Sequence, residues 1–344
     1  MSSAKLFGAL VCCIALMATS VAHAATRRVP QQYRTIQAAI DAAAPGDHIR
    51  VDRGRYCGAT LTKAVVLEGH HRPRIVGCDT SPMVTAGLRV GFYLPGVKGV
   101  NPASGSRIRG FVFDGEGISN ANLAPLAFGI FARFASDVVV QRNRFEGTVQ
   151  AITNTAGDRW RIEHNRIRHL TVLDCTVHCT GGDGIVIGLA RSGVAAPGGD
   201  EAAINRPEGN LVRHNHVQGE APDRFGAFSL AGVLLLSADH TTVRSNRLEL
   251  RDNPNAAAVG QGILVSNSCC GLKTSFLPGS RFTTLAFNDG RKSEVGIVVE
   301  GSGGANTQGL VLRKNRGAAL IEGAEQLARV ARSVLGPLRA QPTL

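Results

Sequence analysis

The chain has 344 residues, among them 41 Gly but only 3 Tyr and 1 Trp. So few aromatic residues argue against a long groove of sugar-stacking rings, while much glycine beside Val, Ile, Leu and Ala is typical of many short strands joined by tight turns. The 38 Lys and Arg against 26 Asp and Glu give a net charge of +12. This charge would attract polyanions, or it reflects arginine spread evenly over the surface.

The first 24 residues are expected to be an export signal. Lys5 precedes an apolar run from Leu6 to Ala22, and Ala22-His23-Ala24 supplies the small residues for cleavage after Ala24. The run is too short for a membrane anchor, and no later stretch has the length to span a bilayer. We therefore predict a soluble mature protein in the periplasm or outside the cell.

Residues 25–47 are predicted to form a segment that caps the fold with one short helix. Thr35 can cap this helix, Ile36, Ala39 and Ile40 fall on one face, and Pro45-Gly46 ends it. Strands are expected next over residues 48–51, 61–68 and 74–77, which are too short for a sandwich of ordinary depth.

Six of the eight cysteines remain after cleavage, and an even number in an exported chain suggests disulfides. Cys57 and Cys78 lie about one repeat apart, so they could sit one above the other on neighbouring strands. Cys175 and Cys179 could close a small loop. The adjacent pair at 269 and 270 would form a strained ring or stay free. A zinc site using these residues with His178 is a further alternative.

From residue 107 onward two strand patterns alternate. In the first, an apolar strand is followed by a basic or polar pair and an asparagine, over residues 138–147, 160–169, 211–219, 242–248 and 310–317. In the second, a small residue precedes three mostly apolar ones, over residues 129–132, 151–154, 184–187, 232–235, 262–265 and 296–299.

The asparagines of the first pattern are Asn143, Asn165, Asn215, Asn246 and Asn315. A coil of about 22 residues fits their four intervals as one, two, one and three coils, with extra residues looped out. Asparagine tolerates the left-handed conformation of a sharp corner, and stacked amides can hydrogen-bond from coil to coil. We therefore predict an all-β, single-stranded right-handed parallel β-helix over residues 48–317.

These repeats, together with the opening segment over residues 35–56, resemble the pectin-lyase-like superfamily of right-handed parallel β-helices. That group contains pectate lyases, polygalacturonases, pectin methylesterases and alginate epimerases. The resemblance covers residues 33–320 and implies the fold, but it does not specify the reaction.

The second strand pattern predicts an apolar outer face. Placing Ile185 and Ile187 inward leaves Val186 outward, and the same alternation leaves Leu234, Leu264 and Val298 outward. Such a face needs a cover, for which the irregular stretches 190–208 and 267–294 are long enough. Residues 318–344 are predicted to form an amphipathic helix and tail that cover the open C-terminal end.

The densest polar cluster, residues 174–184, carries the candidate catalytic residues Asp174, His178 and Asp183. Two carboxylates and a histidine on a stapled loop could supply an acid and a base, or bind a cation. The segment resembles the Gly-His-Gly strand of polygalacturonases, with Asp183 where that family has histidine. The preceding coil lacks the paired aspartates of those hydrolases, so the alternative is a loop with Asp in its turns.

Arginines could meet the carboxylates of an acidic glycan by bidentate pairing. We take Arg133 as a candidate, and Arg191 and Arg213 as further ones if they point outward. The alternative for all three is a solvated face.

A speculative calcium site uses Asp137, Asp158 and Asp239, which stacked coils would bring into a column. Lyases with this fold use calcium together with an arginine or lysine base, as the resemblance implies. Capping of turns at the repeat corners is the alternative role for these aspartates.

Together these patterns suggest an exported protein that acts on or binds an acidic polysaccharide, with β-elimination the favoured reaction. The alternative is a non-catalytic glycan-binding or structural solenoid of the envelope or matrix. We expect no nucleic-acid partner, because interleaved aromatics for base stacking are lacking. We also expect no transmembrane segment, and a monomer.

Overall fold

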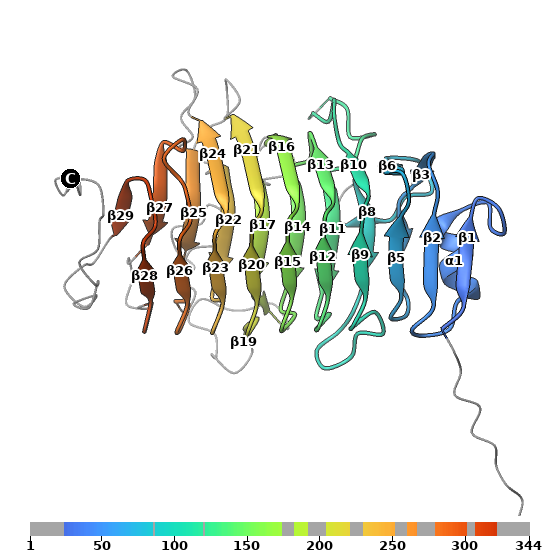
Figure 1. Cartoon of the computed structure of the whole chain (residues 1–344), viewed down its shortest axis with the longest axis horizontal. Helices are drawn as coiled ribbons and strands as arrows, with labels where there is room; N and C mark the ends of the chain where they lie inside the picture. Colours follow the sequence, from blue (N-terminus) through green and yellow to red (C-terminus); the bar gives the residue numbers. More distant parts are fainter. Residues whose placement is uncertain are drawn as a thin grey trace, which may run out of the picture.

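The computed structural model describes residues 24–84, 87–119, 121–173, 182–191, 204–220, 230–251, 260–266, 279–300 and 307–321. Within these ranges the chain winds into stacked coils along one long axis (Figure 1). A typical coil contributes one strand to each of three sheets, and neighbouring strands of each sheet pair in parallel. This is the single-stranded right-handed parallel β-helix that the sequence predicted.

Each coil runs from sheet A through sheet B to sheet C. Sheet A contains β1 (Thr26–Val29), β2 (His48–Val51), β5 (Val66–Gly69), β9 (Arg107–Arg109), β12 (Val139–Gln141), β15 (Arg161–Glu163), β20 (Leu211–Arg213), β23 (Thr242–Arg244), β26 (Thr284–Ala286) and β28 (Val311–Arg313). Sheet B contains β3 (Arg55–Cys57), β6 (Arg74–Val76), β10 (Val112–Asp114), β13 (Arg144–Glu146), β16 (Arg166–Leu170), β21 (His216–Glu220) and β24 (Arg247–Arg251).

Sheet C contains β4 (Ala59–Thr60), β8 (Leu88–Leu94), β11 (Phe128–Arg133), β14 (Gln150–Thr155), β17 (Asp183–Gly188), β22 (Leu230–Leu236), β25 (Gly260–Ser266), β27 (Val295–Val299) and β29 (Ala319–Ile321). Two antiparallel pairs stand apart from this pattern, β7 (Met83–Val84) with β8, and β18 (Ala190–Arg191) with β19 (Ile204–Asn205).

The interior follows from strand length and alternation. In the three-residue strands only the middle side chain faces inward, as with Val140 in β12 and Phe145 in β13. The longer strands of sheet C turn two side chains inward, as Ile185 and Ile187 of β17 show. One continuous apolar core therefore runs through the coils.

An asparagine ladder joins consecutive coils at the corner between sheets A and B. The backbone N and the Nδ2 of Asn165 both donate to Oδ1 of Asn215, each at 3.0 Å. Nδ2 of Asn165 also donates to Val140 O at 2.9 Å, so every polar group in this buried corner has a partner. The ladder consists of Asn143, Asn165, Asn215, Asn246, Asn288 and Asn315.

The structure corrects three details of the predicted ladder. Asn165 bonds directly to Asn215 across 50 residues, so that interval is one coil and not two. The interval from Asn246 to Asn315 holds two coils and not three, because Asn288, which we missed, lies between them. The left-handed residue is the one before each asparagine, for example His164 with φ 56 and His214 with φ 54, and not the asparagine itself.

The N-terminal cap matches the expected helix. Helix α1 (Ile36–Ala42) begins after Thr35, whose side chain accepts a hydrogen bond from Ala38 N at 3.1 Å. Ile36, Ala39 and Ile40 are its buried residues. The helix ends at Ala42, with Ala43 as its C-cap, before Pro45-Gly46.

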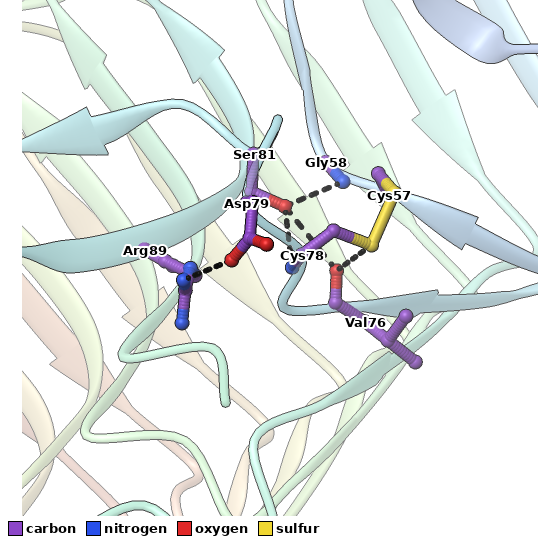
Figure 2. The surroundings of a disulfide bond; sticks show 7 residues. All are labelled: Cys57, Gly58, Val76, Cys78, Asp79, Ser81 and Arg89. Carbon is purple, nitrogen blue, oxygen red and sulfur yellow. Dashed lines mark hydrogen bonds and ion pairs between the residues drawn. A yellow bond between two sulfur atoms is a disulfide. The ribbon is translucent and has the colours of Figure 1, made fainter. Parts of the chain in front are cut away.

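The disulfide between Cys57 and Cys78 staples two adjacent turns of the N-terminal coils (Figure 2). The two Cα atoms lie 5.4 Å apart, close to the roughly 5 Å between neighbouring strands. Ser81 Oγ holds the same corner by accepting hydrogen bonds from Gly58 N and Cys78 N, each at 3.1 Å. This confirms the expected pairing, whereas Cys175, Cys179, Cys269 and Cys270 lie outside the described residues.

The outer face of sheet C is apolar, as predicted. Val186, Leu264 and Val298 point outward, yet only 4% to 6% of each residue is exposed. The expected cover is wrong for residues 279–294, because this stretch contains β26 and the ladder residue Asn288. The rest of the expected cover lies largely outside the described residues.

The C-terminal helix does not begin where we expected. Ala319–Ile321 form β29, which pairs in parallel with β27, because Ala319 continues the buried column of Ile297. The coils therefore extend further than the sequence indicated. Residues 322–344 lie outside the described part of the chain, so the remainder of that helix stays a prediction.

Candidate functional site

The outward side chains of sheet B form two polar columns. The first is largely basic, and its members stand in register on neighbouring strands: Arg55, Arg74, Val112, Arg144, Arg166, His216 and Arg247. The second mixes acidic, basic and amide groups: Asp114, Glu146, Arg168, Gln218 and Glu249. Neighbouring strands lie about 4.8 Å apart, so the arginines of the first column recur at multiples of this spacing, interrupted at Val112 and at His216.

Two hollows open on this face toward the C-terminal coils. The larger has a volume of about 540 Å³, and its lining includes Arg168, His169, Gln218, Glu220, Glu249 and Arg251. The smaller has a volume of about 430 Å³ and is lined by Arg247, Leu248, Glu249, Asp289, Arg291 and Lys292. Since Glu249 borders both, we describe them together as the sheet B groove.

Several arginines at this groove lack a partner. Within the described residues, Arg166, Arg168 and Arg251 form no ion pair, and the Nε atoms of Arg166 and Arg168 are buried without a hydrogen-bond acceptor. A guanidinium carries five donors in a fixed fork that matches a carboxylate. The groove therefore offers unused donors for an anionic ligand.

Glu249 is a buried carboxylate that lines both hollows of the groove. Only 6% of its side chain is exposed, and its Oε2 accepts a hydrogen bond from Gln218 Nε2 at 2.9 Å. Arg247 Nε donates to Oε1, with His216 Nε2 3.3 Å and Lys292 Nζ 3.7 Å from the same oxygen. Burial would raise the pKa of Glu249, but the bonds from Gln218 and Arg247 hold it below its ordinary value. The carboxylate is therefore ionised at neutral pH.

His216 stands beside Glu249 as a neutral imidazole. Burial lowers its pKa, and the charges of Arg247 and Arg168 oppose the neighbouring carboxylate. A neutral histidine can accept a proton. The side chain of His216 is 26% exposed and lies next to Glu249, so it could equally position that carboxylate.

Asp183, a predicted catalytic residue, lies on the outer face of sheet C and not in the groove. It is 4% exposed, and Gln150 Nε2 donates to its Oδ2 at 3.3 Å. Its Oδ1 has no hydrogen-bond partner in the part of the chain that the structure describes. Burial raises the pKa of Asp183 to about 7, against the opposing bonds from Ala231 N and Gln150. Asp174 and His178 lie outside the described residues.

The predicted arginines lie on different faces. Arg133 is exposed at the end of β11 in sheet C. Arg213 is in sheet A, where its Nη2 lies 3.2 Å from Glu163 Oε1. The side chain of Arg191 is outside what the structure describes. None of the three is among the residues that line the groove.

The aspartates predicted to bind calcium serve turns at the corner between sheets C and A. Both carboxylate oxygens of Asp137 accept bonds from Arg159 at 2.8 Å. Asp158 Oδ1 accepts from Glu208 N at 2.9 Å, and Asp239 Oδ1 accepts from Arg281 N at 3.0 Å. Among the described residues the three carboxylates do not converge on one point. This geometry favours the turn-capping alternative.

Two other groups of side chains do converge closely enough to share an ion, again counting only described residues. Glu116, Glu146 and His169 form one beside the sheet B groove, with His169 Nδ1 3.7 Å from Glu116 Oε1 and 3.8 Å from Glu146 Oε2. Asp52, His70 and His71 form the other, at the N-terminal coils.

Sequence reasoning missed the sheet B groove, although a signal was present. Each recognised ladder asparagine is followed by a basic residue, as in Asn165-Arg166 and Asn246-Arg247. Once asparagine marks the corner, the next residue begins a strand whose alternate side chains face outward. We interpreted the basic residues after each asparagine as part of a turn, and therefore did not predict the polar columns on sheet B.

Among the described residues, no helix combines the length and the apolar character that spanning a bilayer requires.

No protein-family model and no curated protein sequence matches the chain. Similar solved structures include an alginate lyase from Paenibacillus sp. str. FPU-7, at 13% identity and a TM-score of 0.46, covering 83% of this chain and 94% of that one. An A-module of a mannuronan C-5 epimerase from Azotobacter vinelandii has 14% identity and a TM-score of 0.32, covering 90% and 95%. The catalytic domain of an α-1,3-glucanase has 11% identity and a TM-score of 0.38, covering 89% and 67%.

These values identify no reaction for this chain. The fold is established by its three parallel sheets and its asparagine ladder, and it is a right-handed parallel β-helix.

Proposed function

We propose that the sheet B groove binds an acidic polysaccharide outside the cytoplasm. The observation that carries this proposal is the pair of arginines, Arg166 and Arg168, whose buried Nε atoms lack acceptors beside a groove of about 540 Å³. A bound carboxylate would supply acceptors for arginine donors on this face.

The spacing of the basic column supports a polymeric ligand. Its side chains repeat with the rungs, about 4.8 Å apart, which is close to the length of one hexopyranose unit. A uronic-acid chain lying along the helix axis can therefore present carboxylates to successive rungs, such as those of Arg144 and Arg166, and to Arg247 two rungs further on. The net charge of +12 would draw such a chain toward the protein.

The reaction that this arrangement best supports is β-elimination. A guanidinium such as that of Arg168 neutralises the uronate carboxylate and so acidifies the adjacent C–H. We assign His169, an exposed imidazole that lines the groove, as the base that takes this proton. The glycosidic oxygen then leaves with the C–O bonding electrons and is protonated by water, and a carbon–carbon double bond forms in the sugar.

Titration of the purified protein with uronate oligomers tests binding, and the ultraviolet absorbance of unsaturated products tests cleavage, each with and without calcium. Arg168→Ala combined with Arg251→Ala should weaken binding at least about tenfold, since charged hydrogen bonds contribute roughly 1.5 to 3 kcal/mol each. Arg133→Ala is the matched control, because it removes an exposed arginine from sheet C. Equal loss in both variants would contradict a site on sheet B.

Binding with a flat absorbance trace would favour a non-catalytic glycan-binding solenoid. In a cleaving protein, His169→Gln should abolish product formation while keeping affinity within about threefold, because the substituted side chain stays polar. Asp183 is the alternative catalytic group, since a carboxyl with a pKa of about 7 suits proton transfer at neutral pH. Loss of cleavage in Asp183→Asn but not in His169→Gln would move the reaction to sheet C.

The proposed location outside the cytoplasm rests on the expected export signal, and the disulfide between Cys57 and Cys78 supports it. Cell fractionation with N-terminal sequencing should recover a chain that begins at Ala25. A cytoplasmic chain that keeps its first 24 residues would contradict this location.

A further inference from the structure

We propose that Asp52, His70 and His71 form a zinc site at the N-terminal coils, separate from the sheet B groove. Two imidazoles with one carboxylate are a donor set that zinc accepts, with water in the remaining position. The ligand atoms of the three residues lie within 4.8 Å of one another.

The coil geometry places the first two ligands. Asp52 and His70 directly follow the paired strands β2 and β5, and the two residues before them, Val51 and Gly69, are register partners. His70 N donates to Val51 O at 2.7 Å. The side chains therefore stack on adjacent coils, with Asp52 Oδ1 3.4 Å from His70 Nδ1. Two ligands on a tetrahedral zinc stand about 3.4 Å apart, so this pair needs little movement.

A left-handed turn supplies the third ligand. His71 and Arg72 both have φ 59, a conformation that residues other than glycine seldom adopt. In a strand, consecutive side chains would point to opposite faces. Here the turn brings the rings of His70 and His71 together, with centroids 4.0 Å apart.

Gln31 orients the carboxylate of Asp52 through one of its two oxygens. Gln31 Nε2 donates to Asp52 Oδ2 at 2.7 Å, as an outer partner of a metal ligand commonly does. Asp52 Oδ1, the atom that faces His70, is closed off from solvent and accepts no hydrogen bond among the described residues. Its ion pair with Arg50 is long, so a cation bound between this oxygen and the two imidazoles would supply a closer partner.

Arg50 is the competitor for this position. Its Nη2 lies 3.0 Å from His70 Nδ1 and its Nε lies 3.5 Å from Asp52 Oδ1. The same Nη2 lies 3.2 Å from His70 Nε2, so the guanidinium lies against both nitrogens of the ring. Arg50 must swing aside when zinc binds, so its removal should strengthen zinc binding.

Calorimetric titration of the chelator-treated full chain with zinc chloride tests the proposal. We expect one zinc per chain, at least tenfold weaker binding in the double variant His70→Ala with His71→Ala, and tighter binding in Arg50→Gln. The matched control is His164→Ala with His214→Ala, which removes another pair of stacked histidines, with ring centroids 5.0 Å apart. It should leave the affinity for zinc unchanged. A second control, Glu116→Gln with Glu146→Gln, removes the other convergent group.

Zinc binding that is absent from the unmodified chain, that survives in the double histidine variant, or that is lost in either control would overturn the proposal. Should the double variant fail to fold, Asp52→Asn tests the same site by the visible d–d absorption of bound Co²⁺. That absorption should be intense in the unmodified chain and lost in Asp52→Asn.

Discussion

The outer faces of sheets B and C are built on the same coils yet present opposite surfaces. On sheet B the outward residues are charged, and a groove lies among them, lined by Arg168 and Glu249. On sheet C, Leu264 and Val298 point outward and are nevertheless buried. Because the inward residues of both sheets pack into one core, the difference lies in the outward positions alone. In the described residues, sheet B therefore presents polar groups around a groove, whereas the outward apolar positions of sheet C are buried by packing.

The two faces also shift the pKa of a buried carboxyl group in opposite directions. Glu249 on sheet B receives hydrogen bonds from Gln218 and Arg247, which lower its pKa despite burial. Asp183 on sheet C has only Gln150 and a backbone amide, and burial raises its pKa to about 7. The same chemical group is thus stabilised as an anion on one face and as a neutral acid on the other.

The largest expected loss of stability comes from a substitution in the asparagine ladder, which supports both faces. Asn246→Leu would leave Asn215 N and Val212 O without the partners that Asn246 supplies in a buried corner. Asn215 Nδ2 would lose one bond and keep those to Ile162 O and Arg213 O. At roughly 1 to 3 kcal/mol for each lost partner, the free energy of unfolding should fall by about 3 to 5 kcal/mol. Guanidinium unfolding measures this loss, and a change below 1 kcal/mol would show that the ladder does not hold the coils together.

A second prediction separates the faces by their pH dependence. The unfolded pKa of an aspartate is about 3.9, so between about pH 4 and 7 folded Asp183 keeps a proton that the unfolded chain has lost. Stability should therefore fall as pH rises through this window, by an amount on the order of 4 kcal/mol, and then level off. Asp183→Asn should remove the decline, as followed by unfolding at a series of pH values.

Glu249 should show the opposite sign. Its pKa is lowered in the folded state, so its contribution to stability is present above the unfolded pKa of about 4.3 and is lost as pH falls. Glu249→Gln should flatten the acid side of the profile and leave the neutral side unchanged in shape. If the unfolding free energy depended on pH in the same way in Asp183→Asn and Glu249→Gln, the proposed difference between the two faces would be wrong.

A third prediction concerns packing on sheet C. Leu264→Ala removes a side chain that is 4% exposed and clusters with Ala231 and Val298. The unfolding free energy should drop by about 2 to 3 kcal/mol, while the affinity of the folded protein for uronate oligomers stays the same. Weakened binding in this variant would place the ligand on sheet C.

The smallest expected effect on stability belongs to sheet B. Arg168→Ala removes a side chain with no ion pair among the described residues, so unfolding should change by no more than about 0.5 kcal/mol. Binding should nonetheless weaken, and its dependence on salt should become shallower because one cation is gone. A large loss of stability would mean that Arg168 holds the fold and not the ligand.

The sequence was sufficient for the architecture because the repeat is local. Asparagine followed by an apolar alternation specifies a corner and a strand, and the helix starting after Thr35 follows from its own cap. The number of coils was misjudged because loops of different length interrupt the repeat, so that Asn165 and Asn215 are adjacent in space.

The site was harder to predict because it depends on register between distant strands. Arg168, Gln218 and Glu249 approach one another only through the pairing of β16, β21 and β24. Asp183 drew attention through its polar neighbours along the chain, yet its strand turns it onto the apolar face of sheet C. Local density of polar residues was a poor guide where the coils decide which side chains meet.

The most direct test of a ligand site on sheet B is a crystal structure of the protein with a defined uronate tetramer. We predict electron density for the sugars along β16, β21 and β24, with carboxylates within hydrogen-bond distance of Arg168 or Arg251. Density over the outer face of sheet C, or an empty groove at saturating ligand, would contradict it.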